Sequence, residues 1–123
     1  MEFKDKKAIY IQIADYICEN ILNGHWKEEE RIPSVREFAV SIEVNPNTVM
    51  RTYSYLQDAG IIYNKRGIGY FISKDAYTET VKLKKESFIN NDLPYFYKYL
   101  KLLDLSLEDI EKLFKEYVKQ ENS

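Results

Sequence analysis

The sequence predicts a mainly α-helical chain that contains one small β-hairpin. Apolar residues recur at helical spacing in the first half of the chain and again in its last third. Between these stretches the pattern changes to two short β-prone runs on either side of a turn with two glycines. The chain has 123 residues, of which 45% are hydrophobic, so it can form one small domain with an appendage.

The first helix is expected over residues 8–23, with Gly24 ending it. Its apolar face is formed by residues at helical spacing: Ile9, Tyr10, Ile13, Ile17 and Ile21. Cys18 lies inside this helix, and we expect a small buried residue there rather than a nucleophile paired with His25. A polar, charged connection is expected over residues 25–32.

A second, short helix is expected to begin at Ser34, because Ser34 and Glu37 have the spacing of a capping box. A third helix is expected after Asn45, which is a good N-cap and is followed by proline. We expect this third helix to end near residues 59–60. Its inward stripe is predicted to consist of Val49, Tyr53 and Leu56.

The β-hairpin is expected from the runs at residues 61–63 and 70–72. The turn between them contains Gly67 and Gly69 and has a basic tip. Three further helices are predicted at about 76–90, at about 93–103 and after Ser106, where Asp109 completes a second capping box. The last helix carries an apolar stripe at helical spacing: Ile110, Leu113, Phe114 and Tyr117.

Three helices followed by a hairpin predict a winged helix-turn-helix. In such units the second helix of the motif, here the one after Asn45, enters the major groove of DNA. We expect its first turn to expose short polar side chains and free amide N–H groups to phosphates and base edges. Because the apolar stripe faces inward, Asn47 and Arg51 point outward and are predicted to contact the groove.

Residues 9–73 resemble the DNA-binding domain of the GntR family of bacterial transcription regulators. The matching motifs are Tyr-x-Gln-Ile from residue 10, Ile-Pro-Ser-x-Arg from residue 32, Val-Asn-Pro-Asn-Thr-Val from residue 44, Gly-Ile-Ile from residue 60 and Arg-Gly-x-Gly-x-Phe from residue 66. The third motif and the short C-terminal appendage are more specifically similar to the YtrA subfamily, whose members are small dimers joined mainly by C-terminal helices.

The resemblance implies which residues contact DNA. They are Ser34 and Arg36 before and in the second helix, Asn45, Asn47 and Thr48 at the start of the third, and Arg66, Gly67 and Gly69 in the wing. Lys65 either contacts DNA or fills the turn. Two residues depart from the family pattern, because many members have arginine where Pro46 and Met50 stand. Glu29 replaces a frequent glycine, so either the turn differs or Glu29 has an unusual backbone angle.

The resemblance also implies two domains, a DNA-binding domain over residues 1–74 and a helical dimerisation domain over residues 75–123. The residues expected at the dimer interface are Tyr95, Phe96, Tyr99, Leu113, Phe114 and Tyr117. The aromatic cluster around Tyr95 could instead form a ligand cage, but two short helices enclose little volume. Whether a small-molecule effector binds is left open.

Other functions find little support in the sequence. One cysteine and one histidine cannot form a Cys/His metal cluster, and we expect no metal, no cofactor and no catalytic residue. No run approaches the ~20 apolar residues of a membrane span, and the polar stretch 1–7 is unlike a signal peptide. We therefore expect a cytoplasmic protein that does not bind membranes.

The expected function is a sequence-specific DNA-binding regulator, a repressor that binds a palindromic operator as a homodimer. The alternative is a winged-helix module that binds proteins rather than DNA. The net charge of −2 comes from residues 75–123, where 8 basic residues oppose 10 acidic ones; residues 1–74 have 10 of each. The average charge therefore conceals a local basic face.

Overall fold

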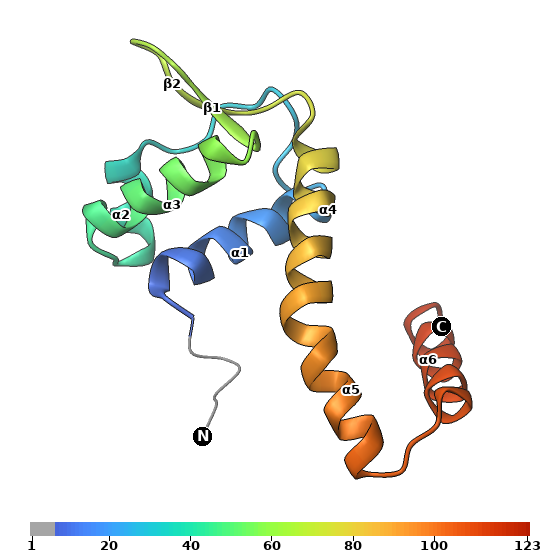
Figure 1. Ribbon diagram of the computed structural model, residues 1–123. Helices are drawn as coiled ribbons and strands as arrows, with labels where there is room; N and C mark the ends of the chain where they lie inside the picture. The colour runs from blue at the N-terminus through green and yellow to red at the C-terminus, as the bar shows by residue number, and fades with distance from the viewer. Residues whose placement is uncertain (1–6) are drawn as a thin grey trace. The chain divides into compact units, whose positions relative to one another are not determined.

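The computed structural model describes residues 7–123, so most of the polar N-terminal stretch lies outside the described residues. The elements in order are α1 (Ile9–Leu22), α2 (Val35–Ile42), α3 (Pro46–Asp58), β1 (Ile62–Lys65), β2 (Gly69–Ile72), α4 (Ala76–Ser87), the π-helical turn η1 (Phe88–Asp92), α5 (Leu93–Leu102) and α6 (Leu107–Glu121) (Figure 1). They form two compact units that divide after Glu86. The functional boundary after Lys74 stays a prediction.

Helices α1, α2 and α3 surround the core of the first unit. The predicted stripe of α3 is fully buried: Val49, Tyr53 and Leu56 have no exposed surface. Ile17 of α1 and Phe38 of α2 belong to the same cluster. Both predicted starts are confirmed. The Ser34 hydroxyl accepts from the Glu37 amide at 3.1 Å in a capping box, and the Asn45 side chain caps α3 with Pro46 in its first turn.

The hairpin pairs β1 with β2 in antiparallel register, with Tyr63 opposite Phe71. The paired strands extend further toward the tip than predicted, since β1 continues to Lys65. Residues 29–32 lie along β2 and exchange backbone hydrogen bonds with it; the Ile32 amide donates to the Tyr70 carbonyl at 2.9 Å. Only a polar, charged connection was predicted for this segment. The pairing was not predicted, because three polar residues beside one isoleucine do not form a strand pattern.

Glu29 has the unusual backbone angle that the sequence allowed, with φ at +67°. Its amide donates to the Ile72 carbonyl at 2.8 Å, and its carboxylate accepts from the Tyr63 hydroxyl at 3.0 Å. This hydrogen bond raises the pKa of Tyr63. These contacts offset the strain that a non-glycine residue has in the left-handed region.

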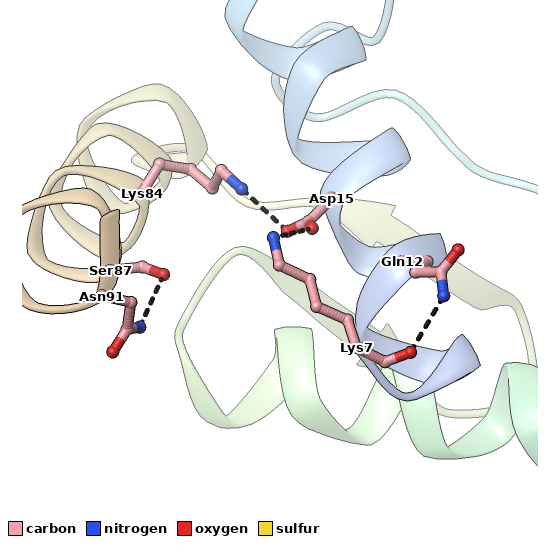
Figure 2. Close-up of polar contacts among 6 residues, drawn as sticks. All are labelled: Lys7, Gln12, Asp15, Lys84, Ser87 and Asn91. Carbon is pink, nitrogen blue, oxygen red and sulfur yellow. Dashed lines mark hydrogen bonds and ion pairs between the residues drawn. The ribbon is translucent and has the colours of Figure 1, made fainter. Parts of the chain in front are cut away.

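Helix α4 belongs to the first unit up to Glu86 and packs on the rest of that unit through its first two turns, where Ala76 and Thr80 are fully buried. Further along, Lys84 Nζ lies 2.7 Å from one Asp15 oxygen, and Lys7 Nζ lies 3.0 Å from the other (Figure 2). Burial by itself raises the pKa of Asp15, but the hydrogen bonds and charges of the two lysines outweigh it, so the pKa is lowered. Asp15 thus connects α1 to α4.

The second unit, residues 87–123, is built differently. The predicted gap between two helices is instead the turn η1, which joins α4 to α5 without a loop. The Asn91 side chain donates to the Ser87 hydroxyl across this turn at 3.3 Å (Figure 2). The capping box of Ser106 and Asp109 starts α6 as predicted. No residue of this unit, all of which the structure describes, is buried.

Among the helices of residues 7–123, none has the length and apolar character required to cross a membrane.

Candidate nucleic-acid interface

The exposed face of α3 begins at its N-terminus. Asn47 and Arg51 both point outward, as predicted, and Thr48 is half-buried beside them. The expectation of free amide groups at this end is wrong. The Asn47 amide donates to Asn45 Oδ1 at 2.8 Å, and the Thr48 amide donates to the Asn45 carbonyl at 3.0 Å. Pro46 has no amide hydrogen, so side chains must supply the contacts here.

Arg51 is held against α1. Its guanidinium carbon lies 3.9 Å from the centre of the Tyr10 ring, which is a cation–π contact. Stacking on the ring leaves the edge of the planar guanidinium, with its N–H donors, available for a ligand. Tyr10, Asn47 and Arg51 also line a depression of about 370 Å³ between the starts of α1 and α3. The contact restricts the rotamers of Arg51 before any ligand binds.

The start of α2 is fixed to α3 and carries a predicted contact residue. Arg36 is exposed and forms no ion pair with any residue of the described chain. The buried Tyr53 of α3 donates from its hydroxyl to the Pro33 carbonyl at 2.7 Å. Burial strongly raises the pKa of Tyr53, so the phenol remains a donor. This bond fixes the turn before Ser34 to the core of α3.

The wing presents Arg66 and Gly67 at its tip, where both are exposed. Gly67 has φ at +81° with open space around it, so a glycine is favoured there by the backbone conformation of the turn and not by a close neighbour. Gly69 is constrained by a neighbour as well as by its φ of +139°. A Cβ atom there would lie 3.1 Å from Nε of Arg31. The predicted role of Gly69 in close approach to DNA is untested, but its lack of a side chain already accommodates Arg31.

Lys65 lies on the face of the hairpin that turns away from α3. It shares that face with Tyr63 and Phe71, and its ammonium lies 5.0 Å from the centre of the Phe71 ring. Tyr70 lies on the opposite face, where its ring packs on Tyr53 with centroids 4.9 Å apart. Lys65 therefore projects in a different direction from Asn47 and Arg51. If it contacts DNA, it does so from the outer face of the wing.

Three residues near the predicted contacts were not predicted. Tyr10 supports Arg51 and Tyr70 contacts Met50, both at the exposed face of α3. Arg31 adds a positive charge beside Gly69 of the wing. Helical periodicity assigned Tyr10 to the inward side, and it does lie partly buried at the edge. No sequence pattern indicates Arg31, because the pairing of its segment with β2 joins residues about forty positions apart.

The structure gives no support to a nucleophilic Cys18 paired with His25. The thiol is 1% exposed, and burial raises its pKa to about 11. His25 is exposed, and its Nδ1 lies 3.2 Å from Asn20 Oδ1. Within residues 7–123 no group of three His, Cys, Asp or Glu side chains could hold a metal ion.

The six predicted interface residues of the second unit are all exposed in the single chain. Tyr95, Phe96 and Tyr99 lie on α5, and the rings of Tyr95 and Tyr99 have centroids 5.1 Å apart. Leu113, Phe114 and Tyr117 lie on one side of α6. Monomeric proteins rarely expose apolar side chains in such density.

Comparison with known proteins places the first unit in a family of regulators. The model of the bacterial regulatory proteins of the gntR family matches residues 9–72. The HTH-type transcriptional regulator YhcF of Bacillus subtilis, itself uncharacterised, is 38% identical over 109 residues, which are 89% of this chain and 88% of that protein. The transcriptional repressor YtrA of the same organism is 42% identical over 81 residues, which are 66% of this chain and 62% of YtrA.

Solved structures agree with the fold. A GntR-family protein from Bacteroides thetaiotaomicron superimposes with a TM-score of 0.78 at 48% identity, covering 93% of this chain and 99% of its own. The DNA-binding domain of AraR in complex with an operator superimposes with a TM-score of 0.50 at 25% identity over 52% of this chain and 77% of its own. These relatives are regulators rather than enzymes.

Proposed function

The chain belongs to the GntR family of bacterial regulatory proteins and is a DNA-binding transcriptional regulator with YtrA-like relatives; from this premise we propose that it is a homodimeric repressor of a palindromic operator. Its DNA ligand would place it in the cytoplasm. No membrane partner, cofactor or metal is part of the proposal.

The observation that carries the DNA side of the proposal is the exposure of cationic and polar side chains on α3, at the start of α2 and on the wing. Asn47 and Arg51 project from α3, Arg36 from the start of α2 and Arg66 from the wing. In a winged helix-turn-helix, α3 would lie in the major groove with Asn47 and Arg51 near base edges. Arg36 and Arg66 would contact phosphates on either side.

Four further predicted contacts have supporting positions. Asn45 and Ser34 each cap a helix, so their side chains stay at helix N-termini, where the positive end of the helix dipole favours phosphate. Thr48 lines the depression that Arg51 also lines. Gly67 allows the wing tip to approach the DNA backbone, since no side chain covers it.

The dimer side of the proposal rests on the second unit. Residues 87–123 bury no side chain completely, although they carry a row of large apolar residues on α5 and α6. Without a core, such a unit gains little free energy from folding alone. A second copy of the chain would cover these residues, and the two-fold symmetry of that pairing would impose a palindromic site with half-sites about one helical turn apart.

A gel-shift titration tests the DNA function. A labelled duplex from the region upstream of the protein's own gene is titrated with protein in the presence of excess non-specific DNA. A saturable complex that resists the competitor is expected. Absence of such a complex there, and in a selection from random duplexes, would favour the protein-binding alternative.

Arginine variants give this experiment residue-level resolution. Arg36→Ala and Arg66→Ala are expected to weaken binding to all duplexes and to reduce the salt dependence of binding, because each removes a phosphate contact. Lys82→Ala on α4 is the matched control, since Lys82 is an exposed cation outside the proposed interface. If Lys82→Ala weakens binding as much as the arginine variants, the proposed contacts are wrong.

A further inference from the structure

The exposed face of α3 carries one large apolar side chain, Met50, among polar neighbours. Asn47, Met50, Arg51 and Ser54 follow one another at helical spacing, and all four are exposed. Met50 is 44% exposed, whereas the inward residues Val49 and Tyr53 have no exposed surface. Met50 therefore lies on the face that would meet the major groove, not in the core.

Two tyrosines border this face. On the side of α1, the Tyr10 ring supports the Arg51 guanidinium at 3.9 Å. On the side of the wing, the Tyr70 hydroxyl lies 4.0 Å from the sulfur of Met50. Tyr70 is itself fixed, because its ring packs edge-on against the buried Tyr53. Met50 thus occupies the half of the face nearer the wing, beside a rigid aromatic neighbour.

The chemistry of the thioether limits what Met50 can recognise. It has no N–H or O–H donor, so it cannot form the bidentate hydrogen bonds by which an arginine recognises guanine. The major-groove edges of the four base pairs present one apolar group, the C5-methyl of thymine. A flexible, polarizable side chain is well suited to pack against such a methyl group.

We propose that Met50 recognises the C5-methyl group of a thymine in each half-site of the operator. This proposal rests on the proposed DNA-binding function and specifies one base that the site must contain. The contact buries the thymine methyl between the thioether and the DNA, on the wing side of the bases that Asn47 and Arg51 would contact.

The test begins with selection of binding sites by the wild-type protein from a library of randomised duplexes. In the selected duplex, each thymine is then replaced singly by deoxyuridine, which removes only the methyl group. Replacement at one thymine per half-site is expected to weaken binding about fourfold, the equivalent of burying one methyl group, or about 0.8 kcal/mol. The other replacements are expected to have smaller effects.

Variants then assign the effect to Met50. Met50→Ala is expected to bind the thymine and deoxyuridine duplexes equally at that position, whereas Met50→Leu is expected to keep the preference. Met50→Arg is expected to select guanine in its place, because arginine bonds O6 and N7. Val40→Ala, an exposed apolar residue on α2, is the matched control and is expected to retain the full preference. Thermal denaturation of each variant checks that the fold is intact.

The outcomes distinguish a wrong assignment to Met50 from a wrong assignment of DNA binding. If the library yields an enriched sequence but no deoxyuridine replacement weakens binding, or if Met50→Ala keeps the methyl preference, the assignment to Met50 is overturned while DNA binding stands. If no sequence is enriched, the proposed function fails and this inference fails with it.

Discussion

The two units of the chain bury their apolar residues differently. In the first unit, Tyr53, Leu56 and Ile17 are completely enclosed by α1, α2, α3 and the hairpin. In the second, Leu113 and Phe114 are more than half exposed. The first unit has a core of its own, and the second has an apolar surface that would need another chain to cover it. The two units therefore differ in whether their large apolar residues are covered within the chain.

Removal of a core side chain from the first unit is expected to have the largest effect. Leu56→Ala should destabilise the protein by about 2–5 kcal/mol, because it leaves a cavity at a fully buried position. Denaturant titration with tryptophan fluorescence measures this. Ser54→Ala, one helical half-turn away on the exposed face, is the control, with an expected change within about 0.5 kcal/mol. Equal losses for both variants would contradict the separation of core and surface.

The corresponding change in the second unit should affect assembly instead of folding. Phe114→Glu places a charge in the apolar stripe of α6 and is expected to weaken self-association by about 2–4 kcal/mol, as at an interface hot spot. The first unit should stay folded. Sedimentation velocity over a concentration series measures the dissociation. Lys112→Gln, at an exposed position on the same helix, is the control, because it also changes the net charge by one unit. If the wild-type protein is monomeric at high concentration, the apolar stripe of α6 does not mediate self-association.

The polar face of the first unit provides the third prediction. Arg51→Ala should weaken specific DNA binding by about 1–3 kcal/mol, because it removes a side chain proposed to read a base. Tyr10→Ala should weaken binding less, since it removes only the ring that supports Arg51. Fluorescence anisotropy on a selected duplex compares both with the Lys82→Ala control. Unchanged affinity for Arg51→Ala would exclude Arg51 from base readout.

The contact between α1 and α4 makes the stability of the first unit depend on pH. The lowered pKa of Asp15 means that its ionised form stabilises the fold above the ordinary carboxyl value of 3.8, and that this contribution is lost as the pH falls through the lower folded-state pKa. Asp15→Asn should therefore flatten the acid side of the stability profile, by at most about 1 kcal/mol for this partly exposed pair.

Thermal denaturation between pH 3 and pH 7 measures that profile. Lys84→Met should produce a similar flattening, because it removes one of the two lysines that lower the pKa of Asp15. An unchanged acid profile in both variants would show that the contact does not contribute to stability.

The smallest effect is expected at the turn between α2 and α3. Glu43 ends α2 with φ at +56°, in the left-handed region that favours glycine. Glu43→Gly should stabilise the first unit by about 0.5 kcal/mol, since relief of strain exceeds the added entropy of the unfolded chain. Chemical denaturation measures the change. A loss of stability would mean that the Glu43 side chain has a stabilising contact.

Much of the first unit was predictable because its local signals agree with one another. The capping box at Ser34, the cap at Asn45 and the buried stripe of α3 each act within a few residues, so the sequence displays them directly. The free amides at the start of α3 were predicted wrongly because the cap that starts the helix also uses those amides.

Contacts between distant segments were not predictable in the same way. The pairing of residues 29–32 with β2, the support of Arg51 by Tyr10 and the contact of Tyr70 with Met50 all depend on how the elements pack. The turn η1 was not predicted, because helical spacing on its two sides indicated two separate helices, whereas the backbone continues between them through a π-helical turn. The site residues themselves remain predictions until DNA binding is measured.

In the proposed dimer, the second unit joins two chains so that two α3 helices meet one palindromic site. Native mass spectrometry of the protein on a duplex selected from random DNA tests it most directly. We expect two chains per duplex, with single occupancy at most a minor species, and two-fold symmetry in the selected sequence. One chain on an asymmetric sequence would show that the second unit does not join two chains on DNA.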